Sequence, residues 1–147
     1  MNDVRKSAEE LVVDSLPSGA LRLNRCSENA CRASSQHMPK IICKGESLIS
    51  DGGKACDCVF FLLEAKNLAT NIGLVELKSN NFNARTIGEK FENVESVVKE
   101  VCSKAGVDIT GISRYVFAKS HPPIGTAAYV IMVKKAGVRL KRCGDQI

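Results

Sequence analysis

The stretch from Cys56 to Arg85 reads CDCVFFLLEAKNLATNIGLVELKSNNFNAR. It holds two mostly apolar runs, residues 56–63 and 73–78, and such runs are typical of strands that are buried on both faces. Charged residues nevertheless stand inside them: Asp57 heads the first run, and Glu76 and Lys78 lie two residues apart in the second. Because a buried charge is costly unless it is paired or binds an ion, these three positions call for a physical explanation.

An amphipathic helix is predicted directly after this stretch, from Phe82 to Lys104. Its apolar residues recur at intervals of four, three, four and three and form one stripe: Ile87, Phe91, Val94, Val98 and Val101. Asn83 is the expected N-cap, and Gly106 is the expected end of the helix.

Upstream of Cys56, the sequence predicts a helix from about Asn2 to Leu16 and a strand over Lys40–Cys43 that Glu46–Ile49 continues. The segment Leu21–Gln36 favours a short helix or an ordered surface loop. The turns between the strands before the second helix are short, so these strands are expected to pair antiparallel.

Downstream of the second helix, the sequence predicts strands over Ser113–Lys119, Ala127–Val133 and Val138–Arg142. The last two are expected to form a C-terminal hairpin. The whole chain, residues 1–147, is therefore predicted to be one α/β domain in which a mixed sheet is flanked by helices, with the element order α-β-β-β-α-β.

Composition limits which partners and which cellular location we expect for the protein. The chain has 147 residues and a net charge of +5, which permits a polyanionic partner without identifying one. It contains no apolar run of 18 residues, and its first 16 residues are too charged for a signal peptide. We therefore expect no membrane span and a cytoplasmic protein.

Cysteines number seven, an odd count that favours reduced thiols over a disulfide framework. Four residues with the spacing C-x4-C-x5-H-x5-C could hold structural zinc: Cys26, Cys31, His37 and Cys43. This spacing matches no standard zinc knuckle, so scattered free thiols are the preferred interpretation. Cys56 and Cys58 are expected to pack on the face opposite to Asp57.

Two carboxylate-x-lysine triplets occur, and chance alone supplies about 1.4 in a chain of this composition. Glu64 and Lys66 lie where a strand enters a turn, so solvent exposure accounts for them. Glu76 and Lys78 instead share one face of a buried strand, because side chains alternate along a strand. Asp57, on the neighbouring strand, is expected to meet Glu76.

Two carboxylates brought together repel each other, and a divalent cation with oxygen ligands, Mg²⁺ or Mn²⁺, relieves that repulsion. A lysine beside the ion can orient or deprotonate a water and can stabilise charge that develops on a phosphate. The trio of Asp57, Glu76 and Lys78 therefore predicts metal-assisted hydrolysis of a phosphodiester.

The string D57-x18-E76-x-K78, set between two helices, resembles the PD-(D/E)XK nuclease superfamily, whose small members include archaeal Holliday-junction resolvases and restriction-endonuclease cores. The resemblance covers about residues 45–119. It implies a restriction-endonuclease-like fold and an endonuclease site in which Asp57 and Glu76 bind Mg²⁺ and Lys78 acts on the water. The implied substrate is nucleic acid, with DNA preferred and RNA left open, and a homodimer would reach both strands of a duplex.

The sequence departs from the family pattern at several positions. Cys56 stands where a proline is common. Many members add an acidic residue from the first helix or the strand after it, for which the candidates are Glu9, Glu10 and Glu46. Many also use a polar group early in the second helix, where this chain has Thr86, Glu89 and Lys90.

Three alternatives stay open. Lys78 could form a structural ion pair with one carboxylate in a non-catalytic subunit that binds nucleic acid or assembles with protein. A zinc-stabilised interaction protein is a weaker alternative. The C-terminal basic residues favour a solubilising sheet edge over a nucleic-acid groove: Lys134, Lys135, Arg139, Lys141 and Arg142.

Overall fold

A six-stranded mixed sheet forms the centre of the computed structural model, which describes residues 6–50, 52–78 and 83–147. The strand order is β1-β4-β5-β6-β7-β8. Strands β1 to β6 pair antiparallel, whereas β6, β7 and β8 run parallel. The bounds are β1 (Arg22–Leu23), β4 (Lys40–Lys44), β5 (Cys58–Leu63), β6 (Ala69–Lys78), β7 (Asp108–Ala118) and β8 (Val138–Arg142). The predicted α/β class with a mixed sheet is confirmed.

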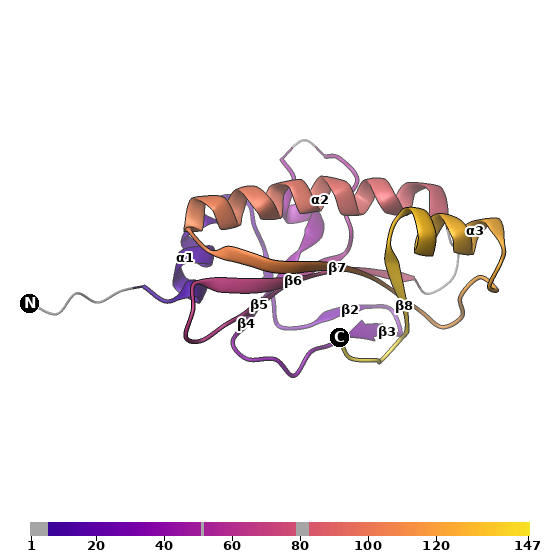
Figure 1. Ribbon diagram of the computed structural model, residues 1–147, viewed down its shortest axis with the longest axis horizontal. Helices are drawn as coiled ribbons and strands as arrows, with labels where there is room; N and C mark the ends of the chain where they lie inside the picture. The colour runs from indigo at the N-terminus through magenta and orange to yellow at the C-terminus, as the bar shows by residue number, and fades with distance from the viewer. Residues whose placement is uncertain (1–5, 51, 79–82) are drawn as a thin grey trace, which may run out of the picture.

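Helices pack on one face of this sheet (Figure 1). They are α1 (Ala8–Ser15), α2 (Ala84–Ala105) and α3 (Ala127–Tyr129), which continues into the π-helical turn η2 (Val130–Lys135). The predicted apolar stripe of α2 is buried against the sheet. Asn83 caps α2 by accepting a hydrogen bond from the Arg85 backbone N–H, and Gly106 ends it at φ 70°. Residues 2–5 and Phe82, which the predicted helices included, lie outside the described residues.

A two-stranded hairpin, β2 (Cys26–Glu28) with β3 (Cys31–Ala33), covers the opposite face (Figure 1). The prediction of a helix or loop for Leu21–Gln36 was therefore wrong. Strands of two or three residues are too short to display alternation, so the sequence carries no periodic signal there. Beneath the hairpin lies a second apolar cluster that includes Phe60, Leu77 and Phe117.

Two disulfides fasten the hairpin, Cys26–Cys58 to β5 and Cys31–Cys143 to the C-terminal segment. The prediction of reduced thiols is wrong for these four cysteines, while Cys43, Cys56 and Cys102 are free. The odd total of cysteines did not reveal these two disulfides, because the other three cysteines remain free thiols that pack in the core as small apolar groups.

The zinc set of Cys26, Cys31, His37 and Cys43 is also wrong, because its members do not converge. Cys26 and Cys31 lie in different disulfides on the hairpin side of the sheet, whereas Cys43 is buried in the cluster on the helix side. His37 Nε2 is hydrogen-bonded to the Leu63 carbonyl oxygen at 2.7 Å.

Two segments predicted as strands are helical. Residues 45–48 form a 3-10 turn, η1 (Gly45–Leu48), and Ala127–Val133 belongs to α3 and η2. A short apolar run fits a helix as well as a strand, and here the Thr126 hydroxyl accepts the Tyr129 backbone N–H and starts the helix. This helical crossover lets β8 pair parallel with β7, so the predicted C-terminal hairpin is wrong.

No helix among the described residues combines the length and the apolar character that a membrane crossing requires.

Candidate active site

Asp57 is held by backbone contacts at the point where β5 begins. Cys58 pairs with Val75, so Asp57, one residue earlier, stands beside Glu76 at the end of the ladder. Asp57 Oδ2 accepts a hydrogen bond of 2.7 Å from the Leu77 backbone N–H. Its own carbonyl accepts one from Gly45, where any Cβ would overlap the Cys56 carbonyl oxygen. A glycine at position 45 therefore lets the 3-10 turn approach Asp57 closely.

Glu76 is the one charged side chain that the described part of the chain fully buries, with an exposed fraction of 1%. Its Oε2 lies 2.6 Å from Lys90 Nζ and 3.2 Å from Lys78 Nζ. The two lysine side chains are about one-fifth exposed, at 23% and 22%. Glu76 thus sits inside the protein while its cationic partners reach toward solvent.

The structure brings Asp57, Glu76 and Lys78 together, as the sequence predicts, and adds Lys90 from α2. From the sequence alone, Lys90 is only one of the polar residues early in the second helix. It follows Ile87 by three residues and precedes Val94 by four, so it lies beside the buried stripe of α2 on the side that faces the sheet. This spacing turns the Lys90 side chain toward the sheet, but it does not identify Glu76 as the partner.

The pKa of Asp57 is raised to about 7. Burial is the main cause and the negative charge of Glu76 is the second, while the hydrogen bond from Leu77 acts in the opposite direction. For Lys90, burial lowers the pKa, but the hydrogen bond and charge of Glu76 outweigh it and the pKa is raised. Lys90 therefore stays an ammonium at neutral pH, whereas Asp57 exchanges its proton there.

The second oxygen of Glu76, Oε1, is buried and receives no hydrogen bond from the described residues. An acceptor left in this state costs about 1–3 kcal/mol, which a proton shared with Asp57 or a cation would recover. Mg²⁺ is bound through one or two carboxylates and otherwise keeps its waters, so this donor pair fits it. No third His, Cys, Asp or Glu joins the pair among the described residues.

Asp57 also faces a pocket of about 450 Å³ on the hairpin side of the sheet. Its walls combine acidic and basic side chains: Arg25, Glu28, Lys44 and Glu46. Of the three additional acidic candidates, only Glu46 lines this pocket. Its side chain is 70% exposed and pairs with Lys44 at 3.0 Å. Glu9 approaches Arg22, and Glu10 hydrogen-bonds Ser7 at the start of α1.

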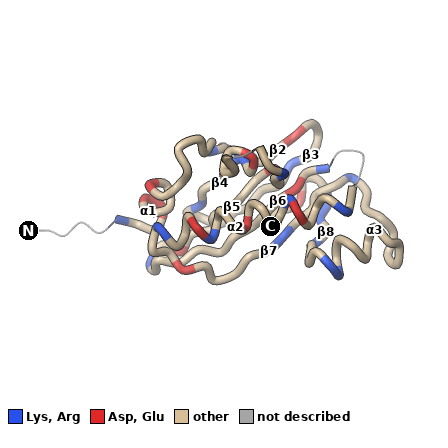
Figure 2. Tube along the Cα trace, turned by 90° about the horizontal axis from the view of Figure 1, so that it is seen from above, with Lys and Arg blue, Asp and Glu red and all other residues tan. Residues whose placement is uncertain are grey.

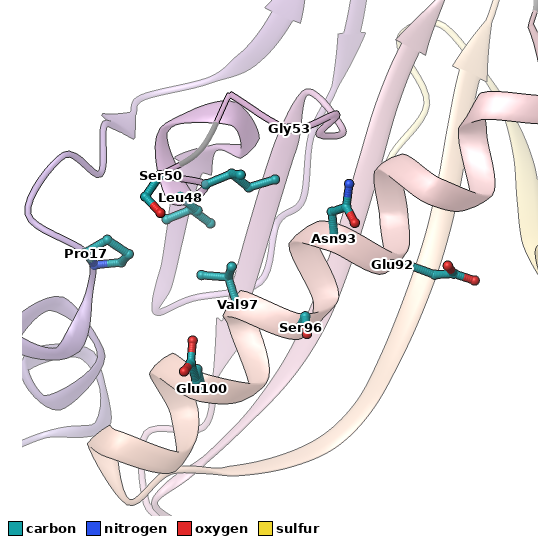
Figure 3. A pocket seen from close by; sticks show the side chains of 10 residues that line it. Pro17, Leu48, Ser50, Gly53, Glu92, Asn93, Ser96, Val97 and Glu100 are labelled. Atoms are coloured by element: carbon teal, nitrogen blue, oxygen red, sulfur yellow. The ribbon is translucent and has the colours of Figure 1, made fainter.

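A second pocket, of about 570 Å³, lies between η1 and α2 (Figure 3). Pro17, Leu48 and Val97 give it an apolar wall, and Glu92 and Glu100 stand at its helix side. Asp57, Glu76 and Lys78 do not line this second pocket.

The remaining candidates have structural partners. Glu89 pairs with Lys54 at 3.5 Å on the surface, and the Thr86 hydroxyl donates to the Asn83 carbonyl. Glu64 and Lys66 are exposed, which confirms the solvated interpretation of the first triplet. Cys56 and Cys58 are both buried as predicted, although they belong to clusters on opposite faces of the sheet.

Comparison with protein-family models, curated proteins and solved structures found no match to this chain.

Proposed function

We propose that this protein is a metal-dependent nuclease of the PD-(D/E)XK type that hydrolyses phosphodiester bonds in nucleic acid, with DNA as the preferred substrate. One observation supports this most: a buried glutamate has one oxygen bound by two lysines and the other oxygen unpaired, beside an aspartate whose pKa is raised to about 7. A carboxyl group with a strongly raised pKa beside a buried charge cluster is typical of functional sites.

In this proposal, Glu76 Oε1 and the Asp57 carboxylate would hold Mg²⁺ or Mn²⁺. The ion, when bound, supplies Lewis-acid polarisation of the phosphate and lowers the pKa of a water. Lys90, the nearer lysine at 2.6 Å, fixes the Glu76 carboxylate in its buried position. Lys78, at 3.2 Å, is left to donate from Nζ to the attacking water or to a phosphate oxygen.

The binding of substrate follows from the same charges. The chain carries a net charge of +5, and Lys78 and Lys90 both reach toward solvent beside the carboxylates. A duplex has two strands to cut, so a homodimer with two such sites is part of the proposal. Its test is the oligomeric state in the presence of duplex DNA.

Glu76→Gln tests the nuclease proposal. The change keeps the volume of the side chain but removes the charge that would bind the ion, so we expect Mg²⁺-dependent cleavage of plasmid DNA to fall at least 100-fold, on the order expected for loss of a general acid-base or metal-binding group. Glu92→Gln is the matched control, because Glu92 is an exposed glutamate of α2 that lines the second pocket. This variant should cleave like wild type. Circular dichroism checks that both variants fold. Equal cleavage by Glu76→Gln and wild type, or no cleavage by either, contradicts the proposal.

A second candidate is a non-catalytic subunit that binds nucleic acid or assembles with protein. The observation that favours it is the double ion pair, since two lysines already neutralise Glu76 and buried ion pairs also occur as structural elements. This candidate predicts DNA binding that needs no divalent ion and weakens steeply with salt, without cleavage.

A further inference from the structure

The carboxyl ends of β6, β7 and β8 lie side by side at one edge of the sheet. Lys78 pairs with Ala118, and Ala118 pairs with Arg142. Side chains in register on neighbouring parallel strands point to the same face. This is the helix-covered face, because Leu74, Val116 and Val138, each an even number of residues earlier on these strands, all pack in the cluster beneath α2. Lys78 and Arg142 thus belong to one row, with the small Ala118 between them.

This row continues the charge of the active site onto β8. Arg142 is exposed, and so is Lys119, which lies in the bend just beyond the end of β7. Within the part of the chain that the structure describes, no carboxylate forms an ion pair with either side chain. The Asp145 carboxylate lies close by but accepts the backbone N–H of Arg142. Figure 2 shows the Lys and Arg positions of this region as blue segments around β8.

The basic residues of β8 are divided between two faces. Arg139 and Lys141 pair in register with Tyr115 and Phe117, which lie on the hairpin side. Arg142 alternates with them and lies on the side of Glu76 and Lys78. A solubilising role for a charged edge strand would not require one of these cations to be aligned with the candidate active site.

We propose that Arg142 and Lys78, together with Lys119 just beyond the end of β7, form a phosphate-binding row that holds the backbone of duplex DNA across the strand ends and leads it to Asp57 and Glu76. Neighbouring strands are about 4.8 Å apart, so the row from Lys78 to Arg142 spans about 10 Å. The side chains of a row of this length can reach two neighbouring phosphates of one DNA strand. The assignment of the row to a cleavage substrate depends on the proposed nuclease function, whereas its binding of DNA can be measured alone.

Two double variants with equal net charge test this row. The first is Lys119→Ala with Arg142→Ala. The control is Lys66→Ala with Lys104→Ala, which removes two exposed lysines at the opposite edge, after β5 and at the end of α2. Both lower the net charge by two, so a nonspecific charge effect would be the same in each.

Fluorescence anisotropy with a short labelled duplex DNA measures the dissociation constant over a range of salt concentrations, in chelator and in the Glu76→Gln background, so that no cleavage occurs. Each lost phosphate contact reduces the magnitude of the slope of log K against log salt by about 0.9. The first variant removes two contacts, so its slope should fall in magnitude by about 1.8, whereas the slope of the control should hardly change. An equal change of slope in the two variants, or no change in the first, would contradict the proposed phosphate-binding row.

The outcomes separate this proposal from the nuclease proposal. If the first variant loses slope and wild type never cleaves DNA with Mg²⁺, the row stands as a DNA-binding surface and the nuclease proposal fails. If wild type cleaves but the two double variants bind alike, the nuclease proposal stands and the row fails. Thermal melting of both double variants confirms that they fold.

Discussion

Asp57 and Glu76 repel each other across the end of β5 and β6, and the protein tolerates this because one proton remains near them. The unfolded chain gives up the Asp57 proton near its ordinary pKa of 3.8, whereas the folded chain keeps it until about pH 7. Between these values the folded state binds more protons, so the contribution of Asp57 to stability is fully present below about pH 4 and is lost as the pH rises through about 7.

Asp57→Asn should remove this pH dependence. The amide oxygen can still accept the Leu77 N–H, but the side chain no longer ionises beside Glu76. Relative to wild type, we expect the variant to gain about 2–3 kcal/mol in the free energy of unfolding between about pH 5 and pH 8. Urea unfolding in chelator measures this. A stability difference that is constant over this pH range would show that Asp57 has no raised pKa.

The individual residues of the site were predictable, and their contacts were predictable only in part. Glu76, Lys78 and Asp57 stood out because charges in a buried strand are costly. The contact of Lys90 with Glu76 and the hydrogen bond from Leu77 to Asp57 depend on how α2 and the strand ends are placed, so the local sequence does not reveal them.

The strands of the hairpin β2–β3 have only three residues each, so this element depends most on its disulfides. The Cys26–Cys58 disulfide links it to the start of β5, next to Asp57. A disulfide stabilises mainly by restricting the unfolded chain. For a loop of 32 residues, the expected contribution is about 3–4 kcal/mol.

Cys26→Ser with Cys58→Ser should therefore lower the free energy of unfolding by about 3–4 kcal/mol. Cys102→Ala, which changes a buried free thiol in α2, is the control for general damage to the core and leaves both disulfides in place. Thiol titration of the denatured wild-type protein should find three thiols before reduction and seven after it. Seven thiols before reduction would contradict the paired state.

At the scale of elements, the long periodic segments were predictable, whereas the two- and three-residue strands and the run of α3 and η2 were not. The stripe of α2 and the apolar runs of β5 and β6 carry enough residues to fix their type. The three-residue strands of the hairpin and the apolar run of α3 and η2 do not. Their type is set by contacts made elsewhere, the disulfides for the first and the parallel crossover to β8 for the second.

For the molecule as a whole, the sheet separates two apolar clusters, one beneath the helices and one beneath the hairpin. The predicted α/β class and antiparallel first strands were correct because they follow from the order of the elements and their short connections. The strand β8 was predicted with its observed bounds, but its parallel pairing with β7 was not, and this pairing brings Arg142 into the row beside the candidate active site.

Calorimetric titration of the wild-type protein with Mn²⁺ at about pH 6 and pH 8 tests the metal site most directly, because Asp57 must lose its proton to bind the ion. We expect one ion per chain, release of close to one proton at the lower pH and much less at the higher pH, and no binding by Asp57→Asn. Absence of saturable binding by wild type, or unchanged binding by Asp57→Asn, would contradict a metal site formed by Asp57 and Glu76.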